Sequence, residues 1–241
     1  MLSTVVALAV GSFVFAEAPR DIGRRIWLNE SNGSEQGLVH WNKGEAFASM
    51  GIGHFIWYPA GQKGRYEETF PRLVEFMKAR GARPPAWLKS GPCPWPDREA
   101  FLAQANGRRA RQLRRFLRRT VGLQARFMTE RLRTVRSMLV MAGVGERFDA
   151  LAQSPAGLYA LTDYLDFKGS GFSPTERYNG KGWGLLQVLE NMRGDGWGKA
   201  GVQDFSRAAA RVLRSRALNS PDAEQELRWL AGWKRRVRTY R

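Results

Sequence analysis

The chain has 241 residues, which allows one large domain or two small ones with a buried core. Hydrophobic residues make up 43% of it, a share that argues against global disorder. The formal net charge of +17 favours polyanionic partners, namely nucleic acid, acidic lipid surfaces or anionic cell-wall polymers. Alternatively, the excess of arginine over lysine reflects the base composition of the gene.

Cysteine and histidine are scarce, which argues against metal and redox chemistry. Cys93 is the only cysteine, and the chain has two histidines. One cysteine cannot form an internal disulfide, and it excludes CxxC redox and zinc motifs. With two histidines in total, a structural or catalytic zinc site is not expected.

The N-terminal segment has features of a signal peptide over residues 1–16. Residues 3–16 form an uncharged, mostly apolar run that is too short for a membrane span. Val14-Phe15-Ala16 resembles a signal-peptidase site, and Ala16-Glu17-Ala18 is an alternative. A basic stretch before the apolar run is missing. We expect export to the periplasm or cell envelope. The alternatives are a mis-assigned start codon and a buried N-terminal helix.

A helix followed by a β-hairpin is predicted next. The helix covers residues 19–30, where Pro19 suits the first turn, and the stretch 31–33 is typical of a helix end. Alternating residues over 37–52, with Asn42-Lys43-Gly44 as the turn, predict the hairpin.

A second helix is predicted at about 69–80, with Thr69 as its cap and Gly81 after its end. The stretch 81–96 is rich in proline and is predicted to be a loop. From Phe101 onward the chain is predicted to be mostly helical.

The helical remainder starts with an arginine-rich stretch over residues 108–141. Its apolar positions follow helical spacing, and they include one polar residue, Gln124. Gly122 is expected to bend or split this helix. Ser154-Pro155 and Ser220-Pro221 each resemble an N-cap followed by the first helical residue.

Those two pairs predict helices at about 155–167 and 221–239, and another helix opens near Gly182. The predicted fold class is therefore mainly α, with one small N-terminal β-hairpin and a large helical remainder. Residues 17–241 are predicted to form a single helical domain.

The first predicted helix and the hairpin carry a recognisable order of residues. Glu30 ends the helix, and the second strand ends in Ser49 followed by Gly51-Ile52-Gly53-His54. This order resembles the phage-type lysozyme family. In that family a glutamate ends the first helix, and the hairpin supplies an acidic residue and a small hydroxyl residue before Gly-Ile-Gly-His. The resemblance covers about 35 of the 241 residues. It implies a lysozyme-like α+β fold and cleavage of the glycan strands of peptidoglycan.

The chain departs from the family pattern at the acidic residue of the hairpin. The family has an aspartate in the hairpin, but no aspartate lies between Asp21 and Asp97. Glu45 is the nearest substitute. Glu35 competes with Glu30 for the role of the first acid, although it falls after the predicted helix end.

The chemistry of glycoside cleavage assigns a role to each candidate. Glu30 would be the general acid, which must still hold its proton near neutral pH. Burial against Trp27, Trp41 and Trp57 would raise its pKa. Glu45 would stabilise the oxocarbenium-like centre, and Ser49 would hold a water. Without a well-placed Glu45, the chemistry is that of a lytic transglycosylase, in which the hydroxyl of the sugar itself attacks.

Each of these residues also has a structural interpretation. Glu30 and Glu45 can be solvated residues of a helix end and a turn, and Ser49 a small strand residue. His54 is predicted to contact substrate without transferring a proton, or to bond neighbouring backbone. Trp57 is either a sugar-stacking residue or part of the core.

Residues 172–189 form a second concentration of unusual residues. A phosphate-binding loop is excluded because no Gly-Lys-Ser/Thr closes the pattern. Gly184-Leu185-Leu186-Gln187 resembles the "GLMQ" element of lytic transglycosylases, and Tyr178-Asn179 resembles their "YN" pair, in a different order. We expect Glu176, Tyr178, Asn179 and Gln187 to line a polysaccharide groove. The alternative is a loop packed under the domain before a helix.

The function that we expect is that of an exported, cell-wall glycosidase: a peptidoglycan hydrolase or lytic transglycosylase, with no cofactor and no metal. Its partners would be peptidoglycan or another anionic polysaccharide, with weak non-specific binding of polyanions, and it would be a monomer. The alternative is a non-catalytic, basic protein that binds the envelope or nucleic acid on a lysozyme-like scaffold.

Overall fold

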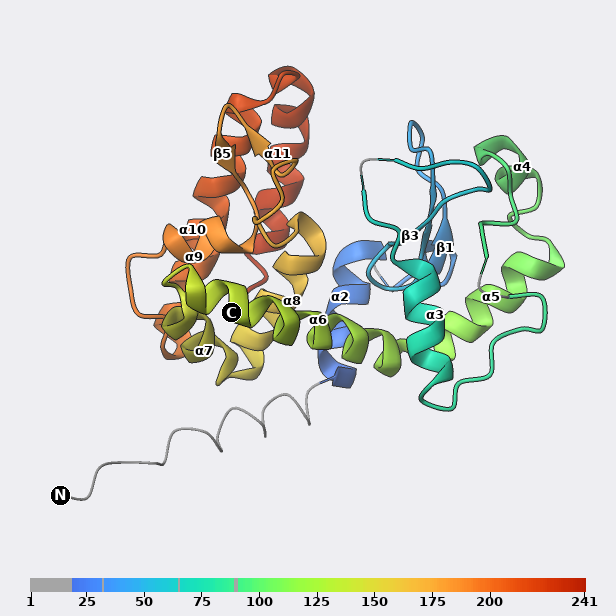
Figure 1. Ribbon diagram of the computed structural model, residues 1–241, viewed down its shortest axis with the longest axis horizontal. Coiled ribbons are helices and arrows are strands. Elements are labelled where there is room, and N and C mark those ends of the chain that lie inside the picture. The colour runs from blue at the N-terminus through green and yellow to red at the C-terminus, as the bar shows by residue number, and fades with distance from the viewer. Residues whose placement is uncertain (1–18, 32, 65, 89–90) are drawn as a thin grey trace. The chain divides into compact units, whose positions relative to one another are not determined.

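The computed structural model describes residues 19–31, 33–64, 66–88 and 91–241, with the backbone alone at 19–21 and 29–31 (Figure 1). The predicted signal peptide, residues 1–16, lies outside the described residues. Residues 19–127 and residues 128–241 form two compact units. We describe each unit by itself, and the single domain predicted over 17–241 stays a prediction.

The chain is mainly helical with small antiparallel sheets, which confirms the predicted mainly α class. The first unit contains, in chain order, α2 (Pro19–Ser31), η1 (Gln36–Leu38), β1 (Val39–His40), β2 (Ala48–Met50), β3 (Phe55–Trp57), α3 (Phe70–Lys78), α4 (Arg98–Ala103) and α5 (Arg108–Arg119). Helix α6 (Val121–Met141) begins in this unit and ends in the second one.

The sheet of the first unit has three strands in the order β1-β2-β3, and both pairs are antiparallel. The predicted hairpin is confirmed as β1 and β2. The third strand is not among the predicted elements, because the sequence after Gly53 shows a run of aromatic residues without clear alternation. The link between β2 and β3 is short, and Gly51 and His54 both adopt positive φ there, at 73° and 51°. Positive φ values favour glycine. The chain therefore reverses direction between β2 and β3 within a few residues, and the alternating pattern of a strand does not reveal such a reversal.

Helix α3 packs against β3 with a buried apolar stripe. Leu73, Val74 and Met77 of this helix are buried. The predicted cap by Thr69 is wrong, because its side chain makes no bond to the helix. The Thr69 hydroxyl instead accepts a hydrogen bond from the backbone of Ile56 at 3.0 Å, so it ties the helix start to the strand.

The arginine-rich stretch is split into α5 and α6 at Thr120, two residues before the predicted break at Gly122. The Thr120 hydroxyl donates to the carbonyl of Phe116 at 2.9 Å. This back-bonding competes with regular helical geometry, which explains why the break falls at the threonine.

The second unit contains α7 (Gly145–Ala152), α8 (Pro155–Lys168), β4 (Arg177–Tyr178), β5 (Lys181–Gly182), α9 (Leu185–Glu190), α10 (Gly198–Asn219) and α11 (Ala223–Val237). Helices α10 and α11 pack against each other, and the β4–β5 hairpin contacts α10 (Figure 1). The predicted cap at Ser154 is confirmed, since its hydroxyl accepts from Gly157 at 3.0 Å. The predicted cap at Ser220 is wrong, because Asp222 accepts from Gln225 at 3.1 Å and starts α11.

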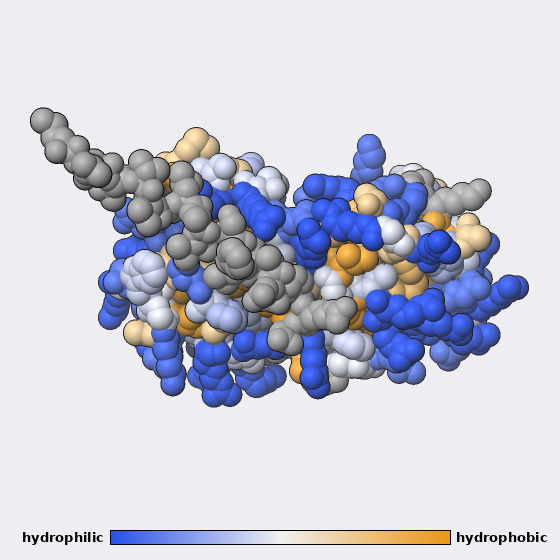
Figure 2. Space-filling view, turned by 90° about the horizontal axis from the view of Figure 1, so that it is seen from below, coloured by the Kyte–Doolittle hydropathy of each residue, from blue (hydrophilic) through white to orange (hydrophobic). Residues whose placement is uncertain are grey.

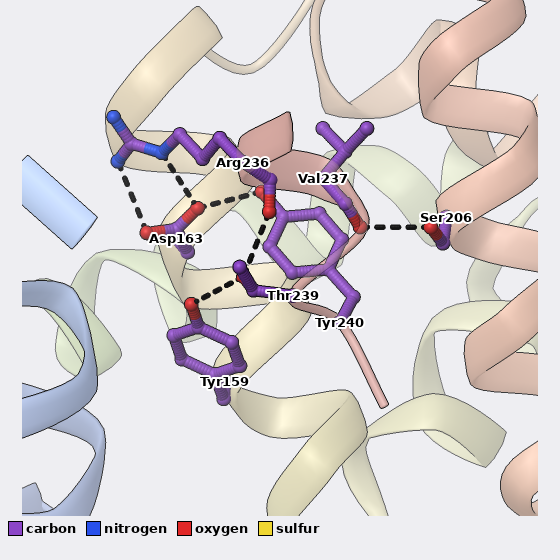
Figure 3. Close-up of polar contacts among 7 residues, drawn as sticks. All are labelled: Tyr159, Asp163, Ser206, Arg236, Val237, Thr239 and Tyr240. Atoms are coloured by element: carbon purple, nitrogen blue, oxygen red, sulfur yellow. Dashed lines mark hydrogen bonds and ion pairs between the residues drawn. The ribbon is translucent and has the colours of Figure 1, made fainter. Parts of the chain in front are cut away.

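A buried ionic cluster fixes the C-terminal segment of the second unit (Figure 3). The carboxylate of Asp163 on α8 is fully buried and accepts two bonds from Arg236, at 2.9 and 3.0 Å. It also accepts one from the Tyr240 hydroxyl at 2.6 Å. The hydroxyls of Tyr159 and Thr239 lie 2.9 Å apart beside it. Three donors satisfy one buried charge, which is the condition for tolerating it in a core.

Polar side chains dominate the coloured part of the surface in Figure 2, in keeping with the high net charge. Of the helices that the structure describes, none combines the length and the apolar character needed to cross a bilayer.

Candidate functional site

The predicted general acid, Glu30, belongs to the last turn of α2, and its side chain lies outside the described residues. The chain folds back onto this helix end. The backbone N–H of Gly33 donates to the carbonyl of Trp27 at 3.3 Å, and the Trp27 indole donates to the carbonyl of Ser34 at 3.2 Å. Gly33 and Ser34 are therefore held against Trp27, one turn before the end of α2.

The Gly51 turn, residues 51–54, has the sequence Gly-Ile-Gly-His and is held from two sides. The Gly51 N–H donates to the carbonyl of Leu38 in η1 at 2.8 Å. The Ile52 N–H donates to the Gln124 side-chain oxygen at 2.9 Å. A Cβ at Gly51 would overlap that oxygen, and the φ of 73° favours glycine as well. The glycine at 51 is therefore required by the local packing.

Gln124 holds the Gly51 turn, although it is not among the predicted site residues. It is fully buried, and its amide nitrogen donates to the carbonyl of Leu117 at 2.6 Å. The amide thus joins the junction of α5 and α6 to the Gly51 turn. The signal for this role was present in the sequence, because Gln124 is a polar residue on an otherwise apolar stripe.

Ser49 and His54 are brought together through His40, which was not predicted to belong to the site. Ser49 pairs with His40 across the sheet and is 2% exposed. The rings of His40 and His54 lie 4.3 Å apart in an edge-on arrangement. The His40 ring nitrogen Nδ1 lies 2.8 Å from the carbonyl of Gly37. Both histidines of the chain therefore meet at the strand that carries Ser49.

The carboxyl group of Glu45 is half-buried in the loop between β1 and β2. Burial raises its pKa, and a hydrogen bond from the Asn42 side chain at 3.1 Å opposes that shift. The Trp41 indole donates to the Glu45 carbonyl at 2.7 Å and fixes the loop. The rival acid Glu35 is exposed and forms an ion pair with Arg118 at 3.3 Å.

Trp57 lies in the core of the first unit. It is 2% exposed, and its indole donates to the carbonyl of Gly91 at 2.8 Å. Its ring packs on Phe70, with centroids 4.7 Å apart. Of the two interpretations of this residue, burial agrees with the core one, so Trp57 is not carried into the proposed site.

In the second unit, Glu176 and Gln187 both bond to a glycine-rich backbone. The Glu176 carboxylate accepts from the Gly171 N–H at 2.6 Å. Burial raises the pKa of this carboxyl, against the opposing effects of that hydrogen bond and of Arg131 and Arg177.

Gln187 lies at the start of α9 and is 9% exposed. Its side chain accepts from the Gly184 N–H at 3.0 Å and donates to the Gly171 carbonyl at 3.2 Å. A Cβ at either glycine would meet nearby atoms. Glycine at 171 and 184 therefore lets these two backbone segments and the Gln187 side chain pack closely.

Tyr178 and Asn179 belong to the β4–β5 hairpin. The Tyr178 ring lies 4.4 Å from that of Trp183, and its hydroxyl donates to Glu226 at 3.4 Å. Asn179 adopts a φ of 49° in the turn and donates to the carbonyl of Asn219 at 3.3 Å. Asn179 is exposed and Tyr178 is half-buried, so both rim the hairpin without being part of the core.

A polar pocket of about 470 Å³ lies between this hairpin, α9 and α10. Its lining includes Arg177, Lys181, Gln187, Glu190 and Arg211. Of the four residues predicted to line a polysaccharide groove, Gln187 lines this pocket. Because Glu30, Glu45, Ser49 and His54 belong to the other unit, a single groove that joins both sets stays a prediction.

Cys93 is buried, and burial raises the pKa of its thiol to about 12. Such a thiol is not an activated nucleophile. Among the described residues, no three acidic, histidine or cysteine side chains lie close enough to hold a metal ion. No family model, curated protein or solved structure matches the chain.

Proposed function

We propose that the chain cleaves the glycan strands of peptidoglycan on a lysozyme-like fold, with Glu30 as the general acid. The observation that carries the proposal is the path of contacts from the last turn of α2 to the Gly51 turn. The Trp27 indole donates to Ser34, three residues after the helix end, and the Leu38 carbonyl of η1 accepts from Gly51. Hydrogen bonds thus tie Ser34 to the helix that carries Glu30, and they tie the Gly51 turn to η1, which follows Ser34 in the chain.

In the proposed reaction, Glu30 gives its proton to the glycosidic oxygen as the bond from that oxygen to the anomeric carbon breaks. Positive charge develops at the anomeric carbon, where the Glu45 carboxylate stabilises it. In hydrolysis, water attacks that carbon and returns a proton to the carboxylate of Glu30. In transglycosylation, a hydroxyl of the same sugar attacks that carbon in place of water and gives its proton to the carboxylate of Glu30.

Ser49 and His54 have supporting roles in this proposal. Ser49 is nearly fully buried, so its hydroxyl orients neighbouring groups or a held water and does not stack on the sugar. His54 packs on His40, which keeps the Gly51 turn in its positive-φ conformation beside Ser49. Glu176, Tyr178, Asn179 and Gln187 of the second unit bind the glycan in this proposal and take no part in the proton transfer.

The test is zymography on peptidoglycan with the wild-type protein, Glu30→Gln and the control Glu35→Gln. The control makes the same chemical change five residues away, at the exposed partner of Arg118. We expect clearing by the wild type and by Glu35→Gln, and a loss of about 10²–10⁴-fold in rate for Glu30→Gln. The circular dichroism spectrum and the unfolding temperature establish that each variant is folded.

The competing function is a non-catalytic, cationic binding protein on the same scaffold. It predicts no clearing from any of the three folded proteins, together with polyanion binding that weakens as salt is added. That pair of results would overturn the glycosidase proposal.

A further inference from the structure

Helix α5 carries seven arginines and no acidic residue within its twelve positions. Its apolar side chains, Ala110, Leu113, Phe116 and Leu117, are all buried. The helix is therefore anchored to the core of the first unit along one face and presents a basic face to solvent.

Four of the exposed arginines follow one another at helical spacing. Arg108, Arg111, Arg115 and Arg119 lie three, four and four residues apart, so they share one stripe of the helix. From the first to the last, this α5 ridge is about 16 Å long, at 1.5 Å per residue.

The charge of the α5 ridge is not neutralised within the described part of the chain. The ion pair that the structure shows for α5 joins Arg118, outside the ridge, to Glu35. Arg111 donates to the carbonyl of Asn106, which carries no net charge. Like charges three and four residues apart repel, so this helix would gain stability from bound anions.

We propose that the α5 ridge docks on the phosphate backbone of double-stranded nucleic acid. Guanidinium groups match phosphate oxygens with paired hydrogen bonds. A straight row of fixed charges on a convex helix suits an extended, rigid polyanion better than a small ligand. The inference goes beyond the proposed function and does not depend on it.

Two other polyanions fit this surface less well. A helix that binds a membrane surface buries apolar side chains in the lipid, but those of α5 are already in the core. Single-stranded nucleic acid is held by stacking on aromatic side chains, and the one aromatic residue of α5, Phe116, is buried. Binding through backbone charges is expected to be independent of base sequence.

The test compares two triple variants of the full chain in fluorescence anisotropy with a labelled DNA duplex of about 20 base pairs, long enough for the ridge to contact several phosphates. The first combines Arg108→Gln, Arg115→Gln and Arg119→Gln. The control combines Arg214→Gln, Arg235→Gln and Arg238→Gln, which removes the same charge from exposed positions of the second unit.

We expect the ridge variant to lose about tenfold or more in affinity at low salt. The slope of log K against log salt should become shallower by about three, because each neutralised phosphate contributes about 0.9. The control should keep most of its affinity. Equal weakening by the two variants would show that binding follows net charge, and it would overturn the proposal.

A second arm uses vesicles in which about a third of the phospholipid is anionic, in place of the duplex. Tighter wild-type binding to vesicles than to duplex, lost in the ridge variant, would assign the ridge to a membrane surface instead. Absence of duplex binding by the wild type at low salt would overturn the proposal outright. The ridge variant is expected to fold, since the change removes repulsion from exposed positions.

Discussion

In the second unit two arginines, Arg216 and Arg236, are held by carboxylates inside the fold, whereas in the first unit the ridge arginines of α5 face solvent. Arg216 pairs with Glu226 at 2.7 Å and Arg236 with Asp163 at 2.9 Å, and both acids are nearly or fully buried. The same residue type therefore stabilises the core of the second unit at two positions and charges one helix surface of the first unit. Net charge alone would not separate these two uses of arginine.

Aromatic rings around Arg216 add to the contrast between the buried arginines and those of the α5 ridge. Arg216 also lies over the rings of Trp183 and Trp233, at 4.4 and 5.1 Å from their centroids. Such packing and the paired carboxylate make removal of the charge costly. In α5, by contrast, removing an arginine of the ridge takes away no buried partner.

The largest effect should come from breaking the cluster of Figure 3. We expect Asp163→Ala to lower the free energy of unfolding by about 3–5 kcal/mol, because the mostly buried Arg236 would lose the carboxylate that it pairs with. Asp149→Ala, at a pair with Arg136 that is 40–48% exposed, should cost about 1 kcal/mol or less. Urea unfolding measures both values. Similar losses for the two variants would contradict the role of burial.

The next effect concerns the amide that holds the Gly51 turn. Gln124→Leu should lower the free energy of unfolding by about 1–3 kcal/mol, since it leaves the buried Ile52 N–H without its acceptor. Gln104→Leu, at an exposed position, is the matched control. If both changes leave stability the same, Gln124 does not fix the turn. A folded Gln124→Leu protein with a large fall in glycan cleavage would support a positioning role.

A smaller effect is expected from the pH dependence of Glu176. Burial raises its pKa, so the folded chain binds this proton more tightly than the unfolded chain. The stability gained from the protonated form is present below the unfolded pKa and is lost as the pH rises through the raised folded pKa. Glu176→Gln, which keeps an acceptor for Gly171, should therefore gain stability over the wild type at about pH 7 relative to about pH 4.

Urea unfolding at both pH values provides the measurement, and Glu190→Gln at the exposed end of α9 is the control for loss of a charge. The opposite sign for Glu176→Gln would mean that its hydrogen bond and nearby arginines outweigh its burial.

The smallest effect belongs to the α5 ridge. Arg115→Gln relieves repulsion from Arg111 and Arg119 and should raise the free energy of unfolding by about 0.2–0.5 kcal/mol at low salt. The gain should vanish at high salt because the charges are then screened. A clear loss of stability would reveal a partner for Arg115 inside the protein.

Much of the secondary structure could be predicted from the sequence, because apolar spacing and proline positions act locally. The helices that start at Pro19 and Pro155 and the hairpin with its turn at residues 42–44 are examples. The caps at Thr69 and Ser220 could not be predicted in this way. Each hydroxyl had another bonding partner, in a distant strand for Thr69 and in a local turn for Ser220.

For the candidate site, the sequence identified the residues that belong to a motif, but it did not identify the residues that contact them. The positions of Ser49 and His54 around His40 depend on strand register, which spacing alone does not fix. Gln124 acts across 72 residues of sequence, so its partner could not be inferred locally. Trp57 shows the converse case: an aromatic beside the motif belongs to the core, because its partners come from the later loop.

The most direct test of glycan cleavage is mass spectrometry of the fragments released from purified peptidoglycan. The wild type should release soluble muropeptides with cleaved glycosidic bonds, ending in a reducing sugar after hydrolysis or in an anhydro sugar after transglycosylation. Folded Glu30→Gln should release almost none, and Glu35→Gln should match the wild type. Release of the same fragments by folded Glu30→Gln, or of none by the wild type, would contradict the account.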